Sequence, residues 1–201
     1  MEKLYIVIPA YNEEMNITSV AREWHTVVET ISEDSKLVII DDGSKDSTYQ
    51  VLTELSKELP QLEVITKKNS GHGATVLYGY RYALEQNADY IFQTDSDGQT
   101  LPEEFYGFWE LRDKYSAVIG YRNHRKDGFS RVFVTKTLKF VLWCIFKLNI
   151  TDANTPFRLL NRDVLQRHIS KIPKDFNLSN VMLTICLVKY KENIPFYTNS
   201  V

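Results

Sequence analysis

The sequence predicts a single α/β domain over residues 1–201, with a central, mostly parallel sheet. Three observations predict this class. Short apolar runs alternate with amphipathic helical patterns for about the first 95 residues, which is typical of layered α/β folds. The apolar runs are nearly uninterrupted, as in strands that helices cover on both faces. Three of these runs lead into polar loops rich in Asp, Glu and Asn.

The first half of the chain is predicted to alternate strictly between strands and helices. Apolar residues at helical spacing, such as Trp24 and Val28, mark the first helix. Pro60 stops the second helix, and Gly71-His72-Gly73 opens the third. The predicted strands are 4–8, 37–40, 62–65 and 90–92, and the predicted helices are 17–31, 51–59 and 71–84.

The second half is less regular. We expect helices near 102–114, 132–148, 162–170 and 178–188, and strands at 117–120, within 152–160 and at 194–197. The chain stops in the last of these strands, and we expect that a C-terminal piece of the domain is missing.

Composition limits the class of protein. A chain of 201 residues, 43% of them hydrophobic, can bury a sizeable core. The net charge of −2 gives no general basic field, so we expect no nucleic acid partner. The longest unbroken apolar run, 140–146, is far shorter than the ~18 residues of a membrane-spanning helix. The two cysteines lack metal-ligand spacing and are typical of a reducing compartment, which predicts a cytoplasmic protein.

Three polar loops follow predicted strands, at 9–14, 41–46 and 95–99. Ligands of such sheets bind outside the carboxyl ends of the strands, so we expect the loops to form one site. Asp95 and Asp97 are spaced i, i+2 and can point the same way in extended chain. Alone they are typical of a solvated turn, but two close carboxylates also suit Mg²⁺, which leaves other positions to substrate phosphates.

Other residues complete a site for a nucleotide sugar. Asp42 ends the second strand, where it can accept hydrogen bonds from a nucleoside. Arg122, Arg125 and Arg131 can bind phosphate, although each alone is typical of a solvated surface charge, and for at least one of them that is the better interpretation. A dinucleotide-binding fingerprint, a phosphate-binding P-loop, a serine nucleophile elbow and paired zinc-ligand histidines are all absent.

The three loops, in their order along the chain, resemble those of family-2 glycosyltransferases. Within that family, Asp95-x-Asp97-x-Gln99 is similar to the D-x-D-x-Q motif of polyprenyl- and dolichol-phosphate sugar synthases. The loop Asn69-x-Gly71-x-Gly73, Gly120-x-Arg122 and the segment from Asp152 to Phe157-Arg158-Leu159 also fit, so the resemblance covers about residues 4–160. The Q-x-x-R-W motif of the processive members is absent, which disfavours a polymerising synthase.

This resemblance implies the GT-A fold, a three-layer sandwich, and an inverting transfer from a UDP- or GDP-sugar. It implies a nucleotide-binding half (1–100) and an acceptor-binding half (101–201). The implied metal, Mg²⁺ or Mn²⁺, is bound by Asp95, Asp97 and Gln99. The candidate substrate-binding residues are Pro9, Ala10, Tyr11, Glu13, Asp42, Gly71, Asp95, Ser96, Arg125 and Arg158. The candidate catalytic residues are Asp152 as a general base and Arg122 and Arg131 as groups that stabilise the leaving diphosphate.

The acceptor stays open between a polyprenyl phosphate and a cell-envelope glycan. A hydroxyl acceptor needs a base such as Asp152, whereas a lipid phosphate is already ionised and needs no strong base. The segment 122–148 carries seven Lys and Arg and one acid, and 132–148 is apolar over most of its surface. This pattern suits the inner face of the cytoplasmic membrane, but equally a helix buried against the sheet or in a homodimer interface.

Two other functions remain as alternatives. A sugar-phosphate nucleotidyltransferase shares the sheet and the metal aspartates, but it needs a Gly-rich basic loop where this chain has Pro9-Ala10-Tyr11-Asn12. A catalytically inactive family member could act as a binding module.

Overall fold

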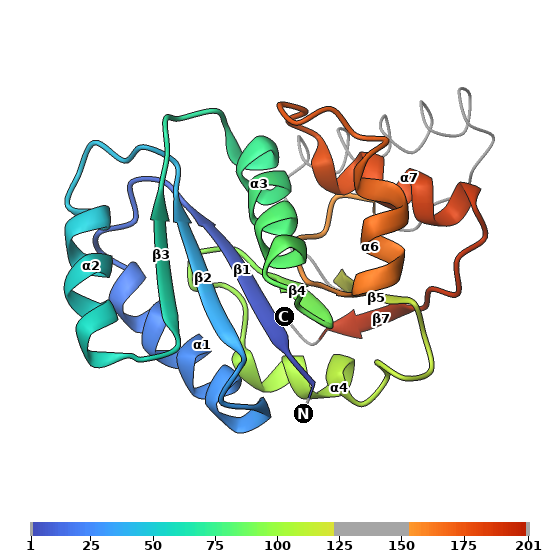
Figure 1. The fold of residues 1–201 in the computed structure, drawn as a ribbon, viewed down its shortest axis with the longest axis horizontal. Helices are drawn as coiled ribbons and strands as arrows, with labels where there is room; N and C mark the ends of the chain where they lie inside the picture. Colours follow the sequence, from blue (N-terminus) through green and yellow to red (C-terminus); the bar gives the residue numbers. More distant parts are fainter. Residues whose placement is uncertain (1, 123–152, 200–201) are drawn as a thin grey trace.

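The structure, a computed structural model, describes residues 2–122 and 153–199 (Figure 1). Within these ranges the chain forms a seven-stranded sheet in the order β3-β2-β1-β4-β6-β5-β7. The strands are β1 (Leu4–Ala10), β2 (Lys36–Asp41), β3 (Leu62–Thr66), β4 (Tyr90–Gln93), β5 (Ala117–Arg122), β6 (Arg158–Asn161) and β7 (Phe196–Asn199). The helices are α1 (Ile17–Ile31), α2 (Thr48–Glu58), α3 (His72–Glu85), the 3-10 helix η1 (Pro102–Glu104), α4 (Phe105–Trp109), α6 (Arg162–Ile169) and α7 (Ser179–Lys189).

Helices cover both faces of this sheet. Along β1, Leu4, Ile6 and Ile8 belong to a buried cluster with α1, α2 and α4. Tyr5 and Val7 point to the opposite face and belong to a second cluster with α3, α6 and α7. Two buried faces explain why the strands are almost uninterrupted apolar runs. The predicted α/β class with a mostly parallel sheet is confirmed.

Strand direction places several loops at one edge of the sheet. β1 is parallel to β2 and β4, and β2 is parallel to β3. β6 is antiparallel to both of its neighbours, β4 and β5, so β5 runs in the same direction as β4. The carboxyl ends of β1, β2, β3, β4 and β5 therefore share an edge. The sequence pattern predicted a strand before residue 160 but not that it runs against the others.

The predicted helix over 102–114 is wrong in its extent. Pro102 opens a 3-10 turn, α4 ends at Trp109, and turns continue to Lys114. The Arg112 guanidinium lies 4.6 Å from the Trp109 ring centroid, and its Nη1 donates to the Trp109 carbonyl at 2.9 Å. These contacts stabilise a turn where the pattern predicted helix. The predicted helix 132–148 lies outside the described residues.

Gly79 allows α3 to pack closely on the sheet. A Cβ built on it would lie 2.4 Å from Val7 Cγ1 and 2.5 Å from Ile40 Cδ1. Alanine normally stabilises a helix interior by ~1 kcal/mol relative to glycine. Overpacking costs ~1–3 kcal/mol, so Gly79→Ala should lower the free energy of unfolding despite its better helix propensity. Urea denaturation can measure this, with Glu85→Ala on the exposed last turn of α3 as control. A Gly79→Ala variant that is more stable than wild type would contradict the close packing.

Candidate functional site

The polar loops that follow β1, β2 and β4 meet at the carboxyl edge of the sheet, as predicted. Ala10 at the end of β1 pairs with Asp41 at the end of β2, and Val7 pairs with Gln93 at the end of β4. The loop after β3 reaches the same edge, because β3 is parallel to β2. The site is therefore built from four strand ends.

Hydrogen bonds join the first two loops. Asn12 N donates to Ser44 Oγ at 2.9 Å, and Lys45 N donates back to Asn12 Oδ1 at 2.8 Å. Glu13 N donates to Thr48 Oγ1 at 2.8 Å. Asn12 adopts a left-handed conformation (φ 57°), which asparagine tolerates better than most residues.

The four candidate residues of the β1 loop differ in accessibility. Pro9 and Ala10 are buried at the end of β1, where they can shape the site but offer no side-chain surface. Tyr11 is 41% exposed, and Glu13 is half-buried. Of this group, only Tyr11 and Glu13 present side chains that a ligand could reach.

Asp42 is buried, and its carboxylate connects β2 to the loop after β3. Its Oδ1 accepts from Lys67 Nζ and from Ser70 N (2.9 Å), and its Oδ2 accepts from Gly71 N (2.8 Å). Burial alone would raise the pKa of Asp42, but the hydrogen bonds and the charge of Lys67 lower it below the ordinary value. Asp42 is thus a buried anion that orders residues 67–71, and its contact with a nucleoside stays a prediction.

Gly71 and His72 connect this carboxylate to the loop after β4. Gly71 precedes α3 and has φ 90°, a backbone conformation that residues with a Cβ rarely adopt. His72, the first residue of α3, places Nε2 3.0 Å from Asp95 Oδ1. This hydrogen bond raises the pKa of His72 above its ordinary value, although partial burial acts in the opposite direction.

Lys67 and His72 were not among the predicted site residues. The signal that could have found them is their position directly after the third predicted strand, whose carboxyl end reaches the same edge. From the loop after that strand, only Gly71 was predicted to bind substrate, and His72 was predicted only to open the third helix.

The loop after β4 offers carboxylates to solvent. Asp95 is half-buried and Ser96 is buried, whereas Asp97 and Gln99 are exposed. Gln99 N donates to Asp97 Oδ1 at 3.0 Å, and Gly98 has φ 71°, so the loop turns back on itself.

These donors suit a metal that is shared with a ligand. Among the described residues, no group of three His, Cys, Asp or Glu is arranged to hold a metal ion. Mg²⁺ commonly takes one or two carboxylates and completes its shell with water and phosphate oxygens. Two carboxylates and an amide on one loop fit that kind of site, and not a site closed by protein ligands alone.

Arg158 is fully buried in β6. Its Nε donates to Thr155 O at 3.0 Å, and its Nη1 lies 3.3 Å from Asn180 O and 3.4 Å from Thr184 Oγ1. The side chain therefore ties β6 to α7, and a contact with a substrate phosphate stays a prediction.

The remaining candidates lie wholly or partly outside the described residues. Arg122 ends β5 at the carboxyl edge of the sheet, but its side chain is outside the described part of the chain. Arg125, Arg131, Asp152 and the segment 123–148 also lie outside it.

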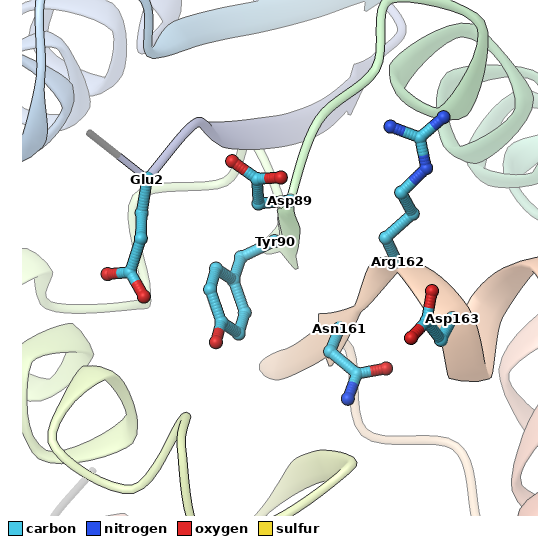
Figure 2. A pocket seen from close by; sticks show the side chains of 6 residues that line it. All are labelled: Glu2, Asp89, Tyr90, Asn161, Arg162 and Asp163. Atoms are coloured by element: carbon cyan, nitrogen blue, oxygen red, sulfur yellow. The ribbon is translucent and has the colours of Figure 1, made fainter.

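A separate pocket of about 540 Å³ lies at the opposite, amino-terminal edge (Figure 2). It is lined by Glu2, Asp89, Tyr90, Asn161, Arg162 and Asp163. Two of its charged groups already have partners: Arg112 Nε donates to Glu2 at 2.8 Å, and Arg162 donates to Asn87 Oδ1 at 2.7 Å. Burial, together with nearby carboxylates, raises the pKa of Tyr90 to about 12. This pocket shares no residue with the predicted site.

Comparisons with known proteins show which proteins the chain resembles. The sequence profile of glycosyl transferase family 2 matches residues 5–169. Undecaprenyl-phosphate 4-deoxy-4-formamido-L-arabinose transferase of Salmonella choleraesuis (strain SC-B67) is 28% identical over 145 residues, which are 71% of this chain and 43% of that protein. UDP-N-acetylglucosamine–dolichyl-phosphate N-acetylglucosaminyltransferase of Methanococcus voltae is 27% identical, over 81% of this chain and 71% of that protein. The chain thus spans less than half of the Salmonella relative.

Solved structures share the fold. Glucosyl-3-phosphoglycerate synthase from Mycobacterium tuberculosis, in complex with Mn²⁺, UDP and phosphoglyceric acid, has a TM-score of 0.70 at 17% identity, over 98% of this chain and 68% of that one. TarS 1–349 of S. aureus has a TM-score of 0.66 at 19% identity, over 98% of this chain and 58% of that one. These likenesses confirm the GT-A fold.

Proposed function

The chain belongs to glycosyl transferase family 2, and on that premise we propose that it transfers a sugar from a UDP- or GDP-sugar to a lipid phosphate, with inversion at the anomeric carbon. The observation that carries this proposal is the continuous path from buried Asp42, through Gly71 and His72, to Asp95 at one edge of the sheet. Such a path matches a donor with a nucleoside at one end and a diphosphate at the other. The lipid phosphate is proposed because both relatives above carry a polyprenyl or dolichyl phosphate in their names.

The proposed reaction forms one bond and breaks another. An ionised oxygen of the acceptor phosphate attacks the anomeric carbon while the bond from that carbon to the diphosphate breaks, and the nucleoside diphosphate leaves. A divalent ion held by Asp95, Asp97 and Gln99 would neutralise charge on the leaving diphosphate. Arg122 and Arg131 are proposed to bind the same developing charge. Asp152 is needed as a base only if the acceptor is a hydroxyl.

Binding of nucleotides is the direct test. Titration calorimetry with UDP and with GDP, each with and without Mg²⁺ or Mn²⁺, should show that one nucleotide binds in a metal-dependent way. Binding of neither nucleotide would contradict the proposal. A screen of nucleotide sugars for slow hydrolysis would then name the donor, and a short polyprenyl phosphate added to that donor should yield nucleoside diphosphate in proportion to glycosylated lipid. Pyrophosphate formed from a nucleoside triphosphate and a sugar phosphate would instead indicate the nucleotidyltransferase alternative.

The cellular location follows from the acceptor. We propose a cytoplasmic protein that meets the inner face of the membrane through the basic and apolar segment 122–148. None of the described helices combines the length and the hydropathy needed to cross a membrane. Co-sedimentation with anionic vesicles that weakens as salt is added would support this contact. If the protein instead forms a homodimer at all salt concentrations and does not sediment with vesicles, the segment 122–148 is better explained as a dimer interface.

A further inference from the structure

The loop that precedes α7 lies against the first turn of α3, at the predicted donor site. A Cβ built on Gly71 would lie 2.5 Å from Asn177 Oδ1, and one built on Gly73 would lie 2.1 Å from Asn177 O. Figure 1 shows this loop beside the start of α3, so residues distant in the sequence meet there. The approach of the Asn177 backbone requires glycine at 73, whereas glycine at 71 is favoured by its φ of 90° and leaves room for the Asn177 amide.

Asn177 touches the stretch of backbone that joins the two carboxylates of the site. Gly71 N donates to Asp42 Oδ2 at 2.8 Å, and the next side chain, His72, lies 3.0 Å from Asp95 Oδ1. A nucleoside diphosphate sugar bound from Asp42 towards Asp95 must pass this stretch. The residue that flanks it from the second half of the chain is therefore placed beside the diphosphate and the sugar.

The side chain of Asn177 is suited to bind such a ligand. Asn177 is exposed, and its amide makes no hydrogen bond to any residue in the described part of the chain. An amide offers two donors and one acceptor, which can serve phosphate oxygens and sugar hydroxyls alike. The backbone of Asn177 packs against Gly73, so the exposed amide is carried on a backbone that is held in place.

We propose that Asn177 is a donor-binding residue that recognises the sugar diphosphate part of the nucleotide sugar. This inference rests on the proposed function, and it assigns to the second half of the chain a role in donor recognition besides acceptor binding. A single hydrogen bond of this kind is worth ~0.5–1.5 kcal/mol. Its loss therefore corresponds to a roughly 2- to 13-fold weaker affinity.

The test compares ligands with and without the sugar diphosphate part. Calorimetry in the presence of Mn²⁺ would use UDP-N-acetylglucosamine and UMP, together with GDP-mannose and GMP. Asn177→Ala should lower the affinity for the nucleotide sugar by roughly 2- to 13-fold, measured with whichever nucleotide sugar wild type binds. The affinity for the matching monophosphate should stay unchanged. The melting temperature should not change, because no hydrogen bond of the fold is removed. Asn177→Asp should lower the affinity for the nucleotide sugar further, since it adds negative charge beside the diphosphate.

Gln86→Ala is the matched control, because Gln86 is an exposed amide just beyond the other end of α3. An affinity of Asn177→Ala equal to that of Gln86→Ala and of wild type would overturn the inference and leave the proposed function intact. Equal weakening of the monophosphate would also overturn it, because the contact would then be with the nucleoside. The proposed function itself fails only if wild type binds neither UDP nor GDP in the presence of Mn²⁺.

Discussion

Asp97→Ala is expected to abolish metal-dependent nucleotide binding and to lower the rate of sugar transfer by at least ~100-fold. A metal on a leaving diphosphate supplies several kcal/mol of transition-state stabilisation, and 1.36 kcal/mol corresponds to a tenfold rate. Asp97 is exposed, and its one described hydrogen bond comes from Gln99 N at 3.0 Å. Surface substitutions of this kind change the free energy of unfolding by ~0.5 kcal/mol or less. Activity should therefore fall without loss of the fold.

The measurement has two parts. Calorimetry with the preferred nucleotide, with and without Mn²⁺, measures how far nucleotide binding depends on the metal. The initial rate of nucleoside diphosphate release measures the rate of sugar transfer. Asp34→Ala is the matched control, because Asp34 is an exposed aspartate just before β2, at the opposite edge of the sheet. If Asp97→Ala keeps a metal-dependent affinity equal to that of Asp34→Ala, the loop 95–99 does not hold the metal.

Asp42→Ala is expected to have the largest effect on stability. It leaves the Lys67 ammonium and the N–H groups of Ser70 and Gly71 without their shared acceptor. The side chains of Asp42 and Lys67 are only 4% and 16% exposed, and removal of one partner from such a buried pair costs ~3–5 kcal/mol. Urea denaturation should show this loss. The double variant Asp42→Ala/Lys67→Met should recover part of it, because it leaves no unpaired buried charge.

The same carboxylate predicts a dependence of stability on pH. The pKa of Asp42 in the folded protein lies below its ordinary value of 3.8. A group with a depressed folded pKa contributes stability above the unfolded pKa, and this contribution is lost as pH falls through the folded pKa. The difference in unfolding free energy between wild type and Asp42→Asn should be constant from about pH 5 to 8 and shrink below roughly pH 4. A difference that grows towards acid would contradict the assignment of Asp42 as the buried anion.

Much of the fold could be predicted from the sequence because its signals are local. Uninterrupted apolar runs mark strands that are buried on both faces, and 3.6-residue spacing marks helices that bury one face. The observed bounds of β1, α1 and α3 are therefore close to the predicted ones. The helix predicted over 102–114 failed because apolar spacing reveals neither the 3-10 turn at 102–104 nor the turns after Trp109, where Arg112 packs on the Trp109 ring.

The candidate site, too, could be predicted from the sequence only in part. Polar loops after parallel strands must meet at one edge, so the sequence could place Asp42, Asp95 and Asp97 there without coordinates. Partners of those residues depend on side chains brought together from separate loops, which no spacing reveals. Lys67 reaches Asp42, and His72 reaches Asp95.

By itself, the sequence determined the fold class, the order of its strands and helices along the chain, and the edge of the sheet at which the site lies. The tertiary structure alone decided that β6 runs antiparallel, that Arg158 is buried between β6 and α7, and that Asn177 packs on Gly71 and Gly73. The physical reason is that periodicity records which side of an element is buried. It does not record which distant residue fills the space beside that element.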